Sequence, residues 1–354
     1  MEPTTFKLAE KPSVKQQITP EHIMQIGLGF WASKTLLAAI KFQLFTILEE
    51  KPLTAKMICE KLKLHKRSYD DFLDTLVSLN FLQREGSGID AIYSNTKDTS
   101  LFLDKKKPSY VGGILEMANH RLYGFWGNLE EALITGKPQN EQKNSSSDDQ
   151  FKQIYSNPET MKEFLIAMAG IQMGAFISFA AKFDFSKYKT FCDAGGALGA
   201  LCVQVAKNHS HINCISYDLS EVAIVAKDYV KQQGLSDRIK TASGNFFENI
   251  PKANIIAMGN ILHDWSEKEK LILMKKAYDS LPTGGAFVCI ENIIDDDRRK
   301  NTFGLMMSLN MLIETKGGKD YTFKEFSKWA KQTGFTSFKL IPLAGPTSAA
   351  VAYK

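Results

Sequence analysis

The sequence is poor in the residues that build disulfide frameworks and metal sites. It contains five cysteines and six histidines in 354 residues. The cysteines form no C-x-x-C pair and most stand in apolar runs, and the histidines are scattered, with only His209 and His211 close together. We therefore expect reduced cysteines in a cytoplasmic protein that binds no metal.

Charge of one sign and long hydrophobic runs are also limited. The net charge of +5 is a mild lysine excess spread along the chain, which gives little support for nucleic acid as a partner. The most apolar early run, 26–40, is interrupted by Lys34 and is shorter than a bilayer span, so we expect no membrane partner. The first residues, 1–19, lack the apolar core of a secretory signal and are predicted to form a flexible arm.

The apolar content of 44% is high enough to fill the cores of two domains. Within 20–108, apolar residues at helical spacing predict two helices before residue 50. Short elements are then predicted in the order helix, helix, strand and strand, over 54–62, 67–79, 81–84 and 91–94. This order indicates a mainly helical, winged-helix domain.

A winged-helix domain serves either to bind DNA or to pack against another chain. The second helix of this one carries Asp70, Asp71 and Asp74, which would repel the phosphates of DNA. We therefore favour a dimerisation domain, and keep a winged-helix regulator that binds DNA as the alternative.

The segment 109–186 is predicted to consist of connecting helices, over 110–133 and 151–183, with an exposed polar loop, 137–150, between them. Both helices are rich in methionine and aromatic residues, among them Trp126 and Met168. Such side chains more often form core, but methionine beside flat aromatics also suits a pocket for a planar apolar substrate.

From 187 to 354 strands alternate with helices, which predicts an α/β fold with a parallel sheet covered on both faces. Only 343–348 separates the last two strands, too few residues for a helical crossover, so these two are expected to form an antiparallel hairpin. The predicted strands are 190–192, 213–217, 239–243, 255–260, 286–290, 335–342 and 349–353.

The stretch TFCDAGGALGALCVQV, 190–205, combines a strand end, a glycine-rich turn and a helix. Glycines let the backbone approach a ligand closely, and the start of the helix offers N–H donors. The glycine spacing is not that of a pyrophosphate or P-loop motif. Asp218 ends the next strand, where doubly wound folds hydrogen-bond a ribose, so the two features together predict a bound nucleoside without a phosphate.

Several separated motifs resemble the S-adenosylmethionine-dependent O-methyltransferases of small molecules, a family with plant phenolic, acetylserotonin and bacterial polyketide members. They are GFWASKTLLAAIKFQLFTIL, CDAGGALG, YDLSEV, SGNFFENIP, NILHDWSEKE and ETKGGKDYTFKEF. The resemblance covers essentially the whole chain. It implies a homodimer with a class I methyltransferase fold, a Rossmann-like seven-stranded sheet whose last hairpin is antiparallel, behind an N-terminal winged-helix dimerisation domain.

The resemblance also implies roles for individual residues. His263 falls where the family has its catalytic base, and Glu291 and Asp320 fall where it has the acidic partners that orient that base. S-adenosylmethionine is the implied cofactor, and the residues implied to bind it are Asp193, Gly195, Gly196, Gly199, Asp218, Leu219, Asn245, Phe246 and Gly259.

Four positions depart from the family pattern. Ala197 replaces a common third glycine, and Asn245 replaces an aspartate that accepts a hydrogen bond from the adenine amino group. Gly259 stands where plant members carry a lysine, and Asp320 is one methylene shorter than the usual glutamate. These departures bear on cofactor affinity and on the reach of Asp320 to His263.

A histidine suits methyl transfer to a phenol, because a phenol of pKa about 10 needs to lose its proton to a base of pKa about 6.5 as attack proceeds. His263 follows a predicted strand end, at the rim where doubly wound sheets bind ligands. The simpler alternatives are a structural histidine, Asp264 as the N-cap of a helix over 266–278, and Asp320 as a turn residue.

A helix predicted over 302–314 places Met307 and Met311 on one face, with Asn310 beside them, where the family lines its acceptor pocket. With Trp126 and Met168, these are the candidates for substrate contact. We expect methyl transfer to a hydroxyl, phenolic in kind, of a planar secondary metabolite. Transfer to nitrogen or carbon and a non-methylating use of the cofactor are the alternatives within this fold.

Overall fold

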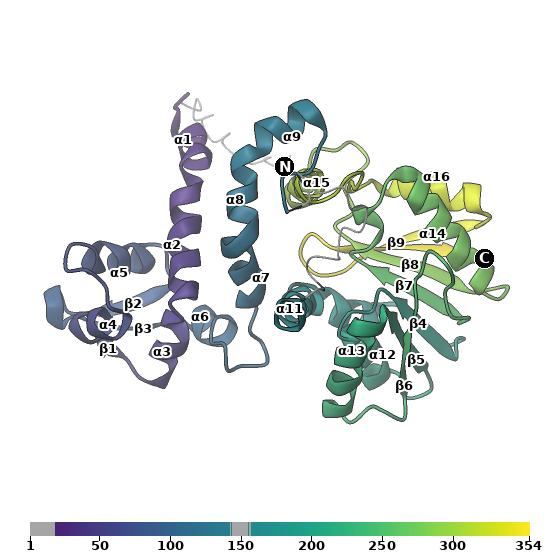
Figure 1. Cartoon of the computed structure of the whole chain (residues 1–354), viewed down its shortest axis with the longest axis horizontal. Coiled ribbons are helices and arrows are strands. Elements are labelled where there is room, and N and C mark those ends of the chain that lie inside the picture. The colour runs from purple at the N-terminus through teal and green to yellow at the C-terminus, as the bar shows by residue number, and fades with distance from the viewer. Residues whose placement is uncertain (1–17, 142, 144–154, 156) are drawn as a thin grey trace, which may run out of the picture.

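The computed structural model describes residues 18–141, 143, 155 and 157–354. The predicted arm up to residue 17, most of the polar loop 137–150 and the predicted helix start at 151 lie outside these residues. An N-terminal helical part and a C-terminal part built on a large sheet stand at opposite ends of the molecule, with long helices between them (Figure 1).

The predicted elements of the N-terminal part are present in the predicted order, but residues 21–50 form three helices where two were predicted, and a helix over 97–102 was not predicted. The helices and strands are α1 (Glu21–Gly27), α2 (Gly29–Lys41), α3 (Leu44–Glu50), α4 (Ala55–Leu62), α5 (Tyr69–Ser78), β2 (Leu82–Glu85), η1 (Gly88–Asp90), β3 (Ile92–Asn95) and α6 (Lys97–Phe102). The sequence missed β1 (Leu53–Thr54), a two-residue strand that pairs with β3 and completes a three-stranded antiparallel sheet. Its brevity explains the omission.

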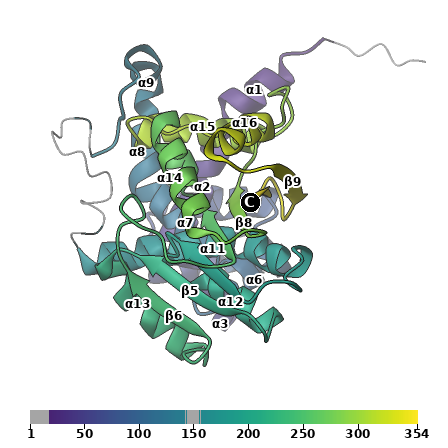
Figure 2. The same ribbon diagram turned by 90° about the vertical axis from the view of Figure 1, so that its right-hand side faces the viewer.

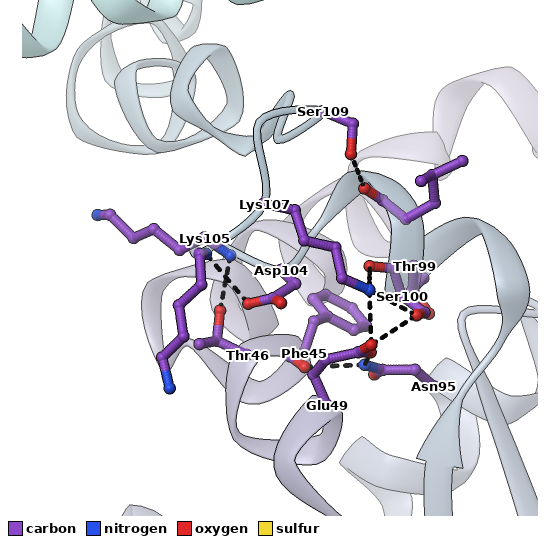
Figure 3. Close-up of polar contacts among 12 residues, drawn as sticks. Phe45, Thr46, Glu49, Asn95, Thr99, Ser100, Asp104, Lys105, Lys107 and Ser109 are labelled. Atoms are coloured by element: carbon purple, nitrogen blue, oxygen red, sulfur yellow. Dashed lines mark hydrogen bonds and ion pairs between the residues drawn. The ribbon is translucent and has the colours of Figure 1, made fainter. Parts of the chain in front are cut away.

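A polar network holds this part together around Glu49, at the end of α3 (Figure 3). The Glu49 carboxylate accepts hydrogen bonds from Asn95 Nδ2 at 3.0 Å, Ser100 Oγ at 2.9 Å and Lys107 Nζ at 2.5 Å. The Lys107 ammonium is the main reason that the pKa of Glu49 is lowered. These bonds join α3 to β3, to α6 and to the loop that follows α6.

The predicted helix over 110–133 is present, but it changes its winding several times. It runs through α7 (Gly112–Met117), the π-helical turn η2 (Ala118–Leu122), α8 (Tyr123–Phe125), η3 (Trp126–Asn128) and α9 (Leu129–Thr135). This irregular rod lies beside α2 and packs against α11 (Pro158–Lys182) (Figure 1). Asn157 caps α11, because its side-chain oxygen accepts from the N–H groups of Glu159 and Thr160.

Two helical runs, 21–41 and 158–182, are long and apolar enough to cross a membrane by length and composition alone. The argument that the first apolar run is too short is therefore wrong, because α1 and α2 form a helical run of 21 residues. The second run, α11, packs against both α7 and α12 (Ala200–Asn208), as core helices of globular proteins do.

The C-terminal part is the predicted seven-stranded sheet with an antiparallel last hairpin. Its strand order is β6-β5-β4-β7-β8-β10-β9, and β10 is antiparallel to both β8 and β9 while the β4–β8 pairs are parallel. The strands are β4 (Thr190–Ala194), β5 (Asn213–Asp218), β6 (Ile239–Ser243), β7 (Ile255–Gly259), β8 (Ala286–Glu291), β9 (Ser337–Pro342) and β10 (Ser348–Tyr353).

Helices cover both faces of this sheet, as predicted (Figure 2). One apolar core joins the sheet to α11, α12 and α13 (Ser220–Gln232). A second core joins the opposite face to α14 (Glu267–Ser280) and α16 (Phe323–Thr333). The short η4 (Leu262–Asp264) comes soon after β7, and the helix α15 (Thr302–Glu314) contacts it. Both therefore lie near the carboxyl ends of the parallel strands.

Candidate active site

The glycine-rich turn after β4 wraps over the end of β5. The N–H groups of Gly195 and Gly196 both donate to the Tyr217 carbonyl, at 2.8 and 3.1 Å. Gly195 has a φ of +81°, and a Cβ at Gly196 would lie 2.6 Å from Ser216 Oγ. Glycine is therefore required at both positions, by conformation at the first and by space at the second.

Ala197, the residue that departs from the pattern of consecutive glycines, has a strained backbone conformation. Its φ is +47°, in the left-handed region that disfavours every residue with a Cβ. The family glycine at this position would avoid that strain. The Ala197 N–H nevertheless donates to Asp218 Oδ2 at 2.8 Å, so the turn stays anchored to β5.

Two carboxylates lie at the ends of the adjacent parallel strands β4 and β5. Asp218 accepts backbone N–H groups on both oxygens, from Ala197 and, at 2.7 Å, from Leu219. Burial raises the pKa of Asp218 to about 6, against the effect of these two bonds. Two effects raise the pKa of the deeply buried Asp193 to about 8. The larger is burial, and the smaller is the negative charge of Asp218.

The side chains predicted to meet an adenine ring surround the next strand end. Leu219 is exposed, and Phe246 packs edge-on against Trp265 with ring centroids 6.2 Å apart. Asn245 closes the turn after β6, since its side-chain oxygen accepts from the Phe247 N–H at 2.9 Å. That oxygen thus already has one donor before any ligand arrives.

A residue that the sequence analysis missed fills the space beside Gly259. A Cβ at Gly259 would lie 3.0 Å from Gln172 Oε1 and 3.3 Å from the Phe176 ring, so α11 leaves no room for a side chain there. Gln172 Oε1 is buried and has no hydrogen-bond partner within the described part of the chain. The sequence could have indicated this residue, because Gln172 is a polar amide in a largely apolar helix. This carboxamide oxygen can accept a hydrogen bond from a ligand.

The predicted catalytic residues come together in one buried cluster. His263, in η4, has its Nδ1 3.3 Å from Asp320 Oδ1 and its Nε2 3.6 Å from Asp264 Oδ1. Glu291, the last residue of β8, forms no hydrogen bond or ion pair with the imidazole ring among the residues that the structure describes. Its Oε1 instead accepts the backbone N–H groups of Ile261, at 3.1 Å, and of His263, at 3.3 Å.

The loop after α15 explains how the shorter Asp320 reaches His263. The Lys319 N–H donates to the His263 carbonyl at 2.7 Å, which brings the loop against η4. A Cβ at Gly318 would lie only 2.6 Å from that same carbonyl oxygen. Asp320 is therefore a buried partner of His263 and is not a simple turn residue.

The alternative interpretation of Asp264 as a helix cap is wrong. Ser266 is the N-cap of α14, and it forms a capping box with Glu269. Asp264 instead lies half-buried next to the imidazole, and loss of solvent around its carboxyl raises the pKa of that group to about 7.

Carboxylates dominate the electrostatics of this cluster. Burial lowers the pKa of His263, but Asp320, Asp264 and Glu291 together outweigh it and raise that pKa to about 10. Burial also raises the pKa of Glu291, against the attraction of His263. Since the groups share protons, their apparent pKa values belong to the cluster as a whole.

The predicted substrate residues lie on the irregular rod, on α11 and on α15. The helix α15 has the predicted bounds, contacts η4 and carries Met307 and the buried Met311. Trp126 Nε1 donates to Asn310 Oδ1 at 2.9 Å, which links η3 to α15. The backbone carbonyl of Met168, on α11, accepts a hydrogen bond from the side-chain amide of Gln172.

An apolar cavity of about 490 Å³ lies between α2 and the rod. Trp126 is the only predicted substrate residue among those that line it within the described chain. Its lining residues are Phe30, Ser33, Leu37, Ala118, Leu122, Tyr123, Trp126 and Gly127.

Comparisons with known proteins identify the family. The sequence model of the O-methyltransferase domain matches residues 126–336, and that of the O-methyltransferase dimerisation domain matches 24–105. The chain belongs to the S-adenosylmethionine-dependent O-methyltransferases.

Individual relatives match along nearly their whole length. The tetracenomycin polyketide synthesis 8-O-methyl transferase TcmO of Streptomyces glaucescens is 34% identical, over 95% of this chain and 97% of that protein. The 3-hydroxy-5-methyl-1-naphthoate 3-O-methyltransferase of Streptomyces sahachiroi is 27% identical, over 92% of each chain. The crystal structure of human N-acetylserotonin methyltransferase in complex with S-adenosylmethionine superimposes with a TM-score of 0.88 at 26% identity, over 96% of this chain and 99% of that one.

The residues of this O-methyltransferase fit its cofactor. The carboxyl groups of Asp193 and Asp218, at the ends of β4 and β5, suit the ammonium and ribose hydroxyls of S-adenosylmethionine once they are ionised. The unpartnered Gln172 Oε1 adds an acceptor at the end of β7. S-adenosylmethionine brings a methyl group on a cationic sulfur, which is the electrophile of the reaction.

Replacing Gly318 is expected to damage catalysis and to leave cofactor binding intact. In Gly318→Ala the new methyl group would meet the backbone oxygens of His263 and Asp264, at 2.6 and 2.8 Å, so η4 or the Asp320 loop must move. A misplacement on the order of 1 Å costs about 10²-fold in rate. Steady-state kinetics should show this loss in kcat. Gly124→Ala, where a Cβ meets nothing within 4 Å, is the matched control, and an equal loss there would contradict the argument.

The dimerisation domain supports a homodimer, and the structure shows an apolar face suited to it. Ile26 and Phe30, on α1 and α2, are 70% and 53% exposed, and Ile23 and Trp31 extend the same face. The double variant Ile26→Asp/Phe30→Asp is expected to be monomeric by size-exclusion chromatography with light scattering. Ile224→Asp, at a residue 67% exposed on α13, should stay dimeric, and a dimeric double variant would exclude this face as the interface.

Proposed function

We propose that this enzyme methylates a phenolic hydroxyl of a planar aromatic acceptor and that His263 is the general base. The observation that carries the proposal is the buried pair of His263 and Asp320, 3.3 Å apart, at the carboxyl rim of the sheet beside the cofactor turn. A hydrogen bond between Asp320 and Nδ1 fixes the orientation of the imidazole ring. Nε2 is then left to take the proton from the hydroxyl group of the methyl acceptor.

The protein has two tasks in such a reaction. It aligns the acceptor oxygen with the methyl group, and orientation of this kind can supply about 7–11 kcal/mol of the barrier. It also removes the phenolic proton as the new bond forms, which is worth roughly 10²–10⁴-fold. The glycine turn with Asp193 and Asp218 serves the first task by holding the donor, and His263 serves the second.

Two observations support an aromatic acceptor. The helix α15, which contacts η4, presents Met307 and Met311, and methionine packs well against flat rings. The names of two relatives refer to O-methylation in the synthesis of a polyketide and to O-methylation of a hydroxynaphthoate. The hydroxynaphthoate is an aromatic ring with a hydroxyl.

A paired screen tests the acceptor class. The enzyme is incubated with S-adenosylmethionine and either a naphthol or the naphthylamine of the same skeleton, and methylated products are measured by mass spectrometry. We expect product from the hydroxyl compound and at least about tenfold less from the amine, because the site offers a base suited to a phenol. Preferential methylation of the amine would overturn the proposal in favour of nitrogen transfer. The regulator alternative predicts duplex DNA binding, which we do not expect.

A further inference from the structure

Lys270 is a buried charge that the proposed mechanism does not use. It lies on the first half of α14 and is only 1% exposed. Burying an ammonium is costly unless partners compensate for the loss of water. Its Nζ donates to the Trp265 carbonyl, and it lies 5.8 Å from the Tyr321 ring centroid and 5.9 Å from that of Trp329. Its position therefore calls for an explanation.

These contacts join the two segments that carry the catalytic pair. Trp265 directly follows η4, which holds His263. Tyr321 directly follows Asp320 in the sequence. One ammonium group thus contacts Trp265, two residues after His263, and Tyr321, the residue after Asp320, and Trp329 anchors it to α16.

The charged groups that face Lys270 come from every element packed around it. Attraction comes from Glu291 on β8, Asp320 in the loop before α16 and Asp264 in η4, and repulsion comes from Lys319. Burial lowers the pKa of Lys270, while the three carboxylates act in the opposite direction. Lys270 thus interacts electrostatically with the same three carboxylates that raise the pKa of His263.

We propose that Lys270 is a positioning residue, whose buried ammonium holds the Trp265 carbonyl and offsets the carboxylates around His263, so that the imidazole releases its proton at a lower pH than it would beside those carboxylates alone. The proposal rests on the proposed role of His263 as base. Its sign is fixed by electrostatics, because removal of a neighbouring positive charge stabilises every protonated form in the cluster.

The test compares the pH dependence of kcat/KM in the full-length enzyme and in two variants. Lys270→Gln keeps a donor for the Trp265 carbonyl but carries no charge, and Lys270→Arg keeps the charge. We expect the rising limb of Lys270→Gln, on the acidic side of its profile, to move to higher pH by roughly one unit, and that of Lys270→Arg to stay with the parent enzyme. A Lys270→Gln profile that is lower at all pH values by the same factor, with an unmoved limb, would show a merely structural role and overturn the proposal.

A second measurement separates this inference from the base hypothesis. The imidazole of His263 is titrated by NMR in protein labelled with ¹³C-histidine and saturated with S-adenosylhomocysteine, and its signal is assigned by its loss in His263→Ala. Removal of the Lys270 charge should raise the midpoint of that titration, whether or not His263 is the base. An unchanged midpoint overturns the proposal. If Lys270→Gln does not fold, the more apolar Lys270→Met, which retains the packing of the stem, is titrated in its place.

Discussion

His263→Ala is expected to lower kcat for a phenolic acceptor by about 10²–10⁴-fold, because the variant lacks the group that removes the acceptor proton. Cofactor affinity should be nearly unchanged, since His263 bonds to Asp320 and to the Glu291 carboxylate, and to no residue of the glycine turn. Steady-state kinetics with a naphthol and calorimetric titration with S-adenosylhomocysteine measure the two quantities separately.

The matched control is another histidine of the same domain. His209 Nε2 lies 2.7 Å from the Ala180 carbonyl, in a contact that joins α11 to the end of α12. His209→Ala should lose some stability and keep its activity once folded. If His263→Ala retained the activity of the parent, His263 would be structural. If it lost cofactor binding together with activity, the collapse of η4 and not the missing base would explain the loss.

The pH profile gives an independent check of the base. With a pKa raised to about 10 by the surrounding carboxylates, His263 is protonated at neutral pH in the ligand-free enzyme. Activity should therefore rise as pH increases above 7. The positive charge of the bound cofactor should lower the pKa of His263, so the midpoint of this rise should lie below the pKa of the ligand-free enzyme. In Asp320→Asn the lost carboxylate should move the limb to lower pH, together with a lower kcat because the ring is less well oriented. A limb that moves upward in this variant would contradict the assignment of Asp320 as the partner of His263.

The sequence was informative wherever a local pattern determines structure. Alternation of strands and helices predicted the sheet and its hairpin, and the bounds of α15 agree with the prediction. The position of His263 after a strand predicted its place at the rim. These predictions depend on residues close together in the chain, for which propensity and periodicity suffice.

Contacts between distant segments could not be predicted in this way. The bond between Trp126 and Asn310 joins two residues that were each assigned to the substrate, and nothing in the sequence indicates that they would satisfy one another. Gln172 fills the space at Gly259 only because α11 crosses the end of β7. Asp264 was a plausible helix cap until Ser266 was seen to fill that role. In each case tertiary packing decided what local chemistry left open.

Asp218→Ala is expected to weaken S-adenosylhomocysteine binding by about 10²-fold or more. The carboxylate can accept the ribose hydroxyls, and loss of hydrogen bonds to a charged acceptor costs about 1.5–3 kcal/mol each. The variant also frees the N–H groups of Ala197 and Leu219, which loosens the turn that holds the methionine end of the cofactor. Asp228→Ala, at an exposed position on α13, is the matched control and should bind like the parent.

The pH dependence of binding identifies the carboxylate that acts. Binding favours the ionised carboxylates, so affinity should fall as pH is lowered, first near the raised pKa of Asp193, about 8, and again near that of Asp218, about 6. Asp218→Asn, which cannot be ionised, should lose the lower step, and its upper step should move to a somewhat lower pH because the charge of Asp218 no longer raises the pKa of Asp193. Calorimetric titrations between pH 5 and pH 9 distinguish the outcomes. If the lower step persisted in Asp218→Asn, a different group would control binding, and the assignment of Asp218 to the ribose would fail.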